Sequence, residues 1–311
     1  MTNGVIPNFF IVGAPKCGTT AMSVYLRGHP NVFMAQPKEP HHFAVDLDGI
    51  SRIKGRKEYL ALFLGRTESH CAVGEASVWY LFSQVAMTLI REFNPDARIV
   101  VMLRNPGDFL RSYHNHLIYS LIESETDFRV AWDLQKERAH GRSLPSRCRM
   151  PGALQYANVA RFGEHVKRLL AVFPREQVYF ILFEDFISAP RDVYTGLLAF
   201  LGLADDGRSV FPLINDARTH RSAVVATLLL NPPAPLRFVW TGLKRLFGPS
   251  IIRHPERLLS LNAKSKKPNP FDLALRREIC VALEDDIKLL SQIIDRDLDS
   301  WLQLRISSEG S

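Results

Sequence analysis

The chain has 311 residues, 46% of them hydrophobic and 23% charged, which argues against global disorder and allows a large core. The formal net charge of +7 at pH 7 favours an anionic ligand or partner without identifying it. The four cysteines are irregularly spaced and form no C-x-x-C pair, which argues against a zinc site or a disulfide framework. We expect a single domain over residues 1–311.

Short apolar runs alternate with helix-like segments along the chain. The predicted strands are residues 9–12, 71–73, 98–103 and 177–183. The predicted helices are the stretch after Gly18 and residues 82–92, 106–121, 156–173, 190–201 and 274–294. Short apolar strands separated by helices are typical of a parallel sheet covered on both faces. The expected fold class is therefore α/β, with a central parallel sheet flanked by helices.

Two segments show no regular pattern. Residues 136–151 mix Arg, Gly, Ser and Pro, which predicts a surface loop. Residues 228–247 are strongly apolar, but three prolines and three basic residues argue against a membrane helix. We expect this second segment to lie on the surface or to line a ligand pocket. The start of the chain lacks a signal-peptide pattern, so we expect a cytoplasmic protein with no transmembrane segment.

The most informative segment is GAPKCGTT at residues 13–20, which follows the first predicted strand and opens a helix. Glycines permit tight turns, and amides at a helix start bind anions. Lys16 adds a positive charge within this loop. The glycine spacing fits the G-x-x-x-x-G-K-[ST] loop of P-loop kinases and NTPases, but Thr19 stands where that loop has its lysine. The segment therefore predicts a phosphate site of a different kind.

A second phosphate element is predicted at residues 100–106, VVMLRNP, where a strand ends in Arg104 and a helix follows. An arginine at the carboxyl end of a strand is well placed for a ligand in an open α/β sheet. Its guanidinium can hold a phosphate with two hydrogen bonds, and Ser112 on the helix adds a hydroxyl.

A candidate general base lies in residues 36–43, QPKEPHHF, which place one carboxylate and two imidazoles in a short loop. Either a glutamate or a histidine can take the proton of an attacking hydroxyl. Glu39 is the preferred base, with His41 in support. His114 and His116 are rival bases of lower rank, because single histidines on a helix are more often packing or surface residues.

Together these motifs resemble the sulfotransferases that use 3′-phosphoadenosine 5′-phosphosulfate (PAPS). The first loop is similar to the family pattern G-x-x-K-x-G-T-T, the LRNP turn to its 3′-phosphate segment, and PKEPHHF to P-K-E-x-x-F-F of glycan-type and bacterial members. The resemblance implies that Lys16 stabilises the leaving group, that Glu39 is the catalytic base and that His41 lines the site. It also implies a set of residues that bind the co-substrate, namely Lys16, Cys17, Gly18, Thr19, Thr20, Arg104 and Ser112.

Three later segments match this family less closely. In GEAS, Ala76 stands where glycan-type members have a lysine, and Phe183 replaces a tyrosine before Glu184 and Asp185. The run KSK resembles a late phosphate loop, K-G-R, which makes Lys264 and Lys266 further candidates for the nucleotide phosphates.

The resemblance implies a P-loop-kinase-like fold and in-line transfer of a sulfuryl group from PAPS to an acceptor hydroxyl, with no metal required. The acceptor stays open among glycans, glycolipids and secondary metabolites, as does the oligomeric state. The alternatives are a P-loop kinase or NTPase and a non-catalytic nucleotide- or nucleic-acid-binding protein. The basic residues look scattered and no nucleic-acid-binding module is evident, so we expect no nucleic-acid partner.

Overall fold

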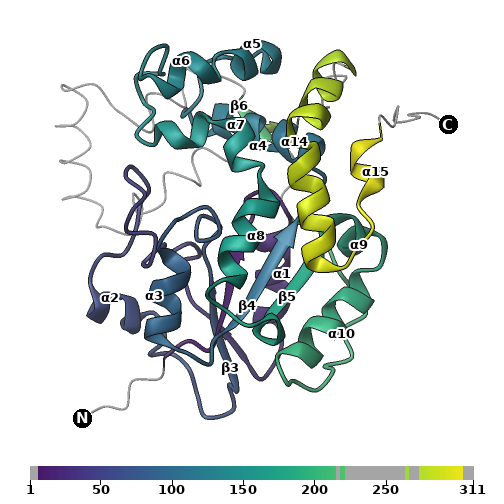
Figure 1. The fold of residues 1–311 in the computed structure, drawn as a ribbon. Helices are drawn as coiled ribbons and strands as arrows, with labels where there is room; N and C mark the ends of the chain where they lie inside the picture. The colour runs from purple at the N-terminus through teal and green to yellow at the C-terminus, as the bar shows by residue number, and fades with distance from the viewer. Residues whose placement is uncertain (1–5, 215–217, 221–262, 266–272, 304–311) are drawn as a thin grey trace.

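The computed structural model describes residues 6–214, 218–220, 263–265 and 273–303. Figure 1 shows the described helices packed around a central sheet. Residues 228–247 and Lys266, both singled out from the sequence, lie outside the described part.

The central sheet has five parallel strands in the order β2-β3-β1-β4-β5. These strands are β1 (Phe9–Gly13), β2 (Val32–Met34), β3 (Ala72–Ala76), β4 (Arg98–Leu103) and β5 (Val178–Leu182). Ile11 of β1 lies in register with Ala76 on one side and Val100 on the other. The α/β class with a parallel sheet flanked by helices, predicted from the alternation of apolar runs and helices, is confirmed.

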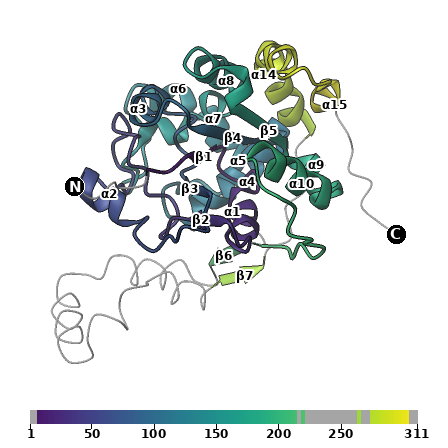
Figure 2. The same ribbon diagram turned by 90° about the horizontal axis from the view of Figure 1, so that it is seen from below.

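Helices cover both faces of the sheet, as the view in Figure 2 shows. On one face lie α1 (Thr19–Arg27) and α10 (Pro190–Phe200), and on the other α3 (Ala86–Phe93) and α8 (Phe162–Leu170). The remaining helices are α2 (Arg56–Ala61), α4 (Pro106–Tyr119), α5 (Phe128–Asp133), α6 (Gln135–Ala139), η1 (Pro151–Leu154), α7 (Tyr156–Val159), η2 (Arg175–Gln177), α9 (Phe183–Ser188), α14 (Leu273–Ile294) and α15 (Asp299–Leu302). Of these, α14 packs on α8. Two further strands, β6 (Arg218–His220) and β7 (Ala263–Ser265), pair in antiparallel fashion.

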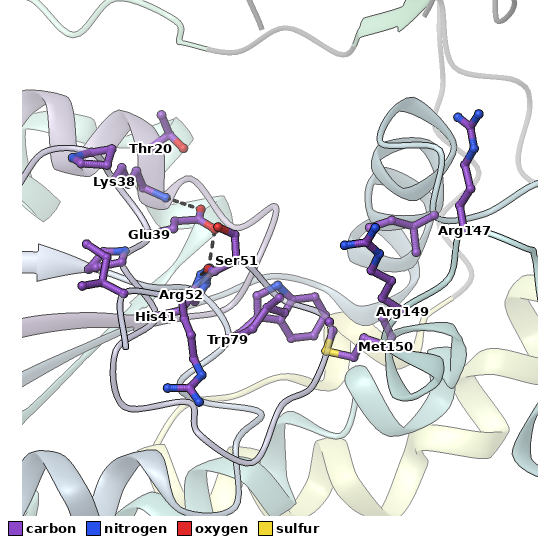
Figure 3. Close-up of a pocket in the computed structure, with 17 residues that line it drawn as sticks. Thr20, Lys38, Glu39, His41, Ser51, Arg52, Trp79, Arg147, Arg149 and Met150 are labelled. Atoms are coloured by element: carbon purple, nitrogen blue, oxygen red, sulfur yellow. Dashed lines mark hydrogen bonds and ion pairs between the residues drawn. The ribbon is translucent and has the colours of Figure 1, made fainter. Parts of the chain in front are cut away.

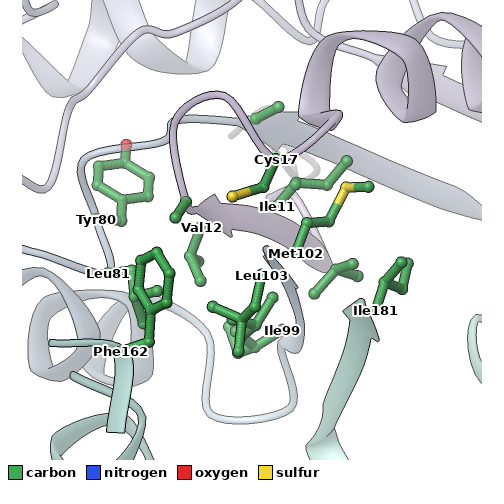
Figure 4. Packing of buried hydrophobic residues seen from close by; sticks show 14 of the residues in the cluster. Ile11, Val12, Cys17, Tyr80, Leu81, Ile99, Met102, Leu103, Phe162 and Ile181 are labelled. Atoms are coloured by element: carbon green, nitrogen blue, oxygen red, sulfur yellow. The ribbon is translucent and has the colours of Figure 1, made fainter. Parts of the chain in front are cut away.

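The core lies along the central strands, where β1 is buried throughout and β4 is buried after its first residue. Figure 4 shows Ile11 and Val12 of β1 packed with Ile99, Met102 and Leu103 of β4. Because helices cover both faces, these strands read as continuous apolar runs rather than as alternating ones. Each such buried side chain contributes roughly 1.5–3 kcal/mol, which fixes the strand ends that carry the site.

Two predicted helices differ from the observed ones for physical reasons. The helix predicted over residues 156–173 is broken into α7 and α8, because the Asp286 carboxylate accepts hydrogen bonds from the amides of Gly163 and Glu164 and so caps a new helix start. The helix predicted from residue 82 begins only at Ala86, since the Ser83 hydroxyl accepts bonds from the amides of the next turn.

The loop predicted over residues 136–151 also differs in part. Its first residues belong to α6, and its last residue opens the η1 turn. Arg138, within it, is buried in an ion pair with Glu123. The segment is thus an anchored wall of the molecule, and its later residues line a cavity described below.

Candidate active site

The site lies at the carboxyl ends of β1 and β4, which are neighbours in the sheet. The chain leaves β1 toward β2 on one side of the sheet and leaves β4 toward β5 on the other. In open α/β sheets, ligands bind at the point where the connections diverge in this way. Lys16 follows β1 and Arg104 follows β4, and Nη1 of Arg104 lies 3.5 Å from the carbonyl oxygen of Lys16.

The loop between β1 and α1 has a tightly defined backbone. Lys16 has a φ of 61° and Gly18 a φ of 87°, both in the left-handed region. A Cβ atom at Gly18 would lie 3.1 Å from the ring of Phe186 and 3.2 Å from that of Phe183, so space as well as φ requires glycine. Helix α1 starts directly after Gly18, and its first amides have no acceptor within the helix. Such a loop is suited to binding a phosphate group.

A cavity of about 530 Å³ opens above this loop. Of the residues predicted to bind the co-substrate, those that line it are Lys16, Gly18, Thr19, Thr20, Arg104 and Ser112. Cys17 does not line it, because its side chain is fully buried in the core (Figure 4). Its thiol donates to the Pro15 carbonyl. The binding role predicted for Cys17 therefore stays a prediction, and it concerns the backbone of Cys17 rather than its thiol.

The cavity holds two cations, Lys16 and Arg104, that form no ion pair with an acidic side chain in the described part of the chain. Burial lowers the pKa of Lys16, and the positive charge of Arg104 lowers it further. The Arg104 guanidinium lies 4.3 Å from the ring centroid of Phe183, which orients it. Two neighbouring cations of this kind favour an anionic ligand.

Glu39 reaches the same cavity from the loop after β2. Both Glu39, with a φ of 67°, and His41, with a φ of 49°, have left-handed backbones, a strained conformation for residues other than glycine. The Glu39 amide donates to the carbonyl of Ala76 at 3.0 Å, and the His41 amide donates to Oγ of Ser77 at 3.0 Å. The end of β3 therefore holds this loop in its strained form.

The charge on Glu39 depends on its two neighbours (Figure 3). Nζ of Lys38 lies 2.7 Å from its Oε1, and Nε2 of His41 lies 3.5 Å from its Oε2. Burial raises the pKa of Glu39, but Lys38 and His41 outweigh it and bring the pKa below its ordinary value. Burial also lowers the pKa of His41, so the imidazole is neutral near pH 7. Lys38 is then the cation that keeps Glu39 ionised.

A buried carboxyl group supports this loop from below. Glu75 of β3 accepts hydrogen bonds from Tyr80 at 2.7 Å, Ser77 at 2.7 Å and Tyr59 at 3.2 Å. Complete burial raises its pKa to about 7, although these three donors lower it in part. The Ser77 hydroxyl also accepts a hydrogen bond from the His41 amide. These hydrogen bonds therefore connect Glu75, inside the sheet, to the loop that carries Glu39.

The two rival histidines separate clearly in the structure. His114 is buried, and its Nδ1 lies 2.9 Å from the Tyr156 hydroxyl, away from the cavity. His116 lies on the cavity wall with Lys16 and Glu39. Burial and the positive charge of Lys16 lower the pKa of His116, so its imidazole is neutral at pH 7.

A second cavity, of about 690 Å³, lies on the other side of Glu39 (Figure 3). The two cavities share Thr20, Glu39 and Trp79, which places the carboxylate at their junction. Sequence reasoning missed the residues that complete this second cavity, among them Arg52, Arg147, Arg149 and Met150. The only sequence signal was the density of arginine in a segment interpreted as an ordinary surface loop.

The remaining predicted residues have mixed outcomes. Glu184 accepts a hydrogen bond from the Asn105 amide and so holds the turn after Arg104, and Asp185 pairs with Arg296. Ala76 is the last residue of β3 and carries no charge. The cation beside Glu39 is instead Lys38. Lys264 lies in β7, whose backbone pairs with β6, and β6 runs beside α4. The Lys264 side chain falls outside the described part.

Comparison with known proteins shows the family and the fold of the chain. Residues 7–216 match the family described as "Sulfotransferase domain". The chain belongs to the sulfotransferase family. A sulfotransferase from Alicyclobacillus acidocaldarius is 29% identical in sequence, with a TM-score of 0.69 over 96% of this chain and 100% of that one. The P-loop-like fold expected from the motifs is thereby confirmed.

Curated relatives of this sulfotransferase family member are larger proteins. Human carbohydrate sulfotransferase 15 is 26% identical over 253 residues, which cover 64% of this chain and 44% of the relative. The bifunctional heparan sulfate N-deacetylase/N-sulfotransferase 2 of Bos taurus is 26% identical over 221 residues, 70% of this chain and 23% of the relative. The chain thus spans less than half the length of either of these relatives.

Two further observations concern the described part of this sulfotransferase family member. None of its described helices is both long and apolar enough to cross a membrane. Across the same residues, no group of three or more histidine, cysteine, aspartate or glutamate side chains is arranged to hold a metal ion.

Proposed function

We propose that this protein transfers a sulfuryl group from PAPS to the hydroxyl of an acceptor molecule. One observation carries the proposal: Lys16 and Arg104, which have no carboxylate partner in the described ranges, share a cavity with the ionised carboxylate Glu39. The cations that would bind a nucleotide phosphate and the base that would deprotonate a hydroxyl thus line the same cavity.

The residues present fit the co-substrate. The loop at residues 13–20 and Lys16 would hold the 5′-phosphosulfate, because the loop offers helix-start amides and a buried cation. Arg104 and Ser112 would hold the 3′-phosphate, since both line the same cavity. When bound, PAPS supplies the sulfuryl group that is transferred.

The chemistry of the protein residues follows from their positions. Glu39 takes the proton of the acceptor hydroxyl as that oxygen bonds to sulfur. Lys16 neutralises the charge that develops on the departing phosphate oxygen, with the loop amides in support. Positioning and electrostatics supply most of the acceleration, as they do in phosphoryl transfer. His116 is the alternative base, because it lines the same cavity in its neutral form.

Thermal unfolding tests this proposal without knowledge of the acceptor. The protein is heated with the product nucleotide 3′-phosphoadenosine 5′-phosphate (PAP) or with ATP and Mg²⁺. At about a hundredfold its Kd, PAP should stabilise the fold by about 2.7 kcal/mol. Lys16→Ala should lose most of this gain, whereas Lys167→Ala, at an exposed position on α8, should keep it. Stabilisation by Mg-ATP but not by PAP would instead favour a P-loop kinase or NTPase.

A further inference from the structure

The cavity of about 690 Å³ on the far side of Glu39 has an uneven charge distribution. Four cationic side chains line it, and Glu39 is its one carboxylate. Lys38 neutralises that carboxylate, since its Nζ lies 2.7 Å from Oε1 of Glu39. Three arginines also line the cavity, namely Arg52, Arg147 and Arg149.

Two of these arginines have no acidic partner within the described ranges. Neither Arg52 nor Arg149 forms an ion pair with a carboxylate there. In Figure 3, Arg149 extends toward the side of the cavity that holds Glu39, and Arg52 lies on the wall below His41. Guanidinium groups form paired hydrogen bonds with carboxylates and sulfates, so these two positions favour an anion.

Two separate segments of the chain build this wall. Gly49, with a φ of 82°, lies against Arg149, because a Cβ atom at Gly49 would clash with the Arg149 carbonyl oxygen. Arg52 follows three residues after Gly49. The close backbone contact therefore places the two arginines around one space and leaves no room for a larger residue at position 49.

The rest of the cavity is suited to a cyclic ligand such as a sugar or an aromatic ring. Trp79, Met150 and Ile122 also line the cavity and give it apolar surface. An aromatic wall with polar groups at its edge can bind the apolar face of a ring and still orient its hydroxyls.

We propose that this cavity binds an acceptor that carries a fixed anionic group, a carboxylate or a sulfate ester, on the same molecule as the hydroxyl presented to Glu39. Arg52 and Arg149 bind the anion and thereby determine acceptor specificity. The inference rests on the proposed function, because it takes this cavity as the acceptor side of the site.

Binding of three matched probes in the presence of saturating PAP tests the proposal. They are p-nitrophenyl β-D-glucoside, which is neutral, p-nitrophenyl β-D-glucuronide, which has a carboxylate at C6, and the 6-O-sulfated glucoside. At low ionic strength, at least one anionic probe should bind about tenfold more tightly than the glucoside. The advantage should shrink as salt rises, because Arg149 is exposed. The stronger of the two anionic probes identifies the group that the cavity prefers.

The variants connect the preference to the arginines. The double variant Arg52→Gln/Arg149→Gln should bind all three probes equally and should bind PAP as the wild type does. Arg149→Lys should keep part of the preference, and Arg142→Gln, an exposed position on the same segment but outside the cavity, should keep all of it. Anionic probes that bind no better than the glucoside, or not at all, would overturn the inference. If PAP itself does not bind, the proposed function fails instead.

Discussion

The buried ion pair between Arg138 and Glu123 anchors the wall of the acceptor-side cavity, and its loss has a predictable cost. The Arg138 and Glu123 side chains are 1% and 0% exposed, and two bonds of 2.6 and 2.9 Å join them. Arg138 also donates to the carbonyl of Ser143, at the start of the segment that carries Arg149. The pair therefore fixes both a buried charge and the path of this segment.

Arg138→Met removes the guanidinium and leaves a buried carboxylate with only three donors, namely Tyr156 and the amides of Ser124 and Glu125. Removal of one partner from a buried ion pair costs about 3–5 kcal/mol. That is a large part of the 5–15 kcal/mol that is typical of a folded domain. Urea unfolding at pH 7 measures the loss directly.

A second variant separates the buried charge from loss of packing. In Arg138→Met/Glu123→Leu the carboxylate is gone as well, so we expect the double variant to be more stable than Arg138→Met alone. A loss below about 1 kcal/mol for the single variant would show that Arg138 does not stabilise a buried charge on Glu123. A double variant that is less stable than Arg138→Met, by the cost of a second independent defect, would show the same.

Two further predictions concern the site. The pKa of the Glu75 carboxyl group is about 7 in the folded protein, compared with an ordinary value of 4.5. The contribution of Glu75 to the free energy of unfolding is therefore complete below pH 4.5 and is lost as the pH rises through 7. Stability measured from pH 4.5 to 8 should thus fall by about 3 kcal/mol more in wild type than in Glu75→Gln, and equal slopes would contradict this. Arg104→Lys keeps the charge but loses the guanidinium fork and its contact with Phe183, so calorimetry should show PAP binding about tenfold weaker; unchanged affinity would argue against Arg104 as a phosphate ligand.

The sequence predicts those parts of the fold that depend on local pattern. The strands at β1 and β4 are continuous apolar runs, and the loop with Lys16 and Gly18 has an unusual composition, so each is evident without coordinates. The break between α7 and α8 is not evident, because it depends on Asp286, more than 100 residues away in the chain. A helix cap supplied from a distant segment leaves no local signal.

The same distinction applies to the site. Lys16, Arg104 and Ser112 could be predicted, since each follows a strand in a recognisable motif. Arg52 and Arg149 could not, because only the contact between two irregular segments brings them to one cavity. The single-domain organisation, the cytoplasmic location and the absence of a nucleic-acid partner stay predictions.

Glu39 is proposed as the base for sulfuryl transfer from PAPS. Transfer of ³⁵S from labelled PAPS to a panel of sugar and phenol hydroxyls measures this role. We expect a labelled product with the wild type and with Glu68→Gln, an exposed control position. Glu39→Gln should lower the rate about 10²–10⁴-fold while PAP binding is retained. Transfer that is unchanged in Glu39→Gln would contradict the assignment of the base, and PAP binding without transfer to any acceptor would favour a non-catalytic nucleotide-binding protein.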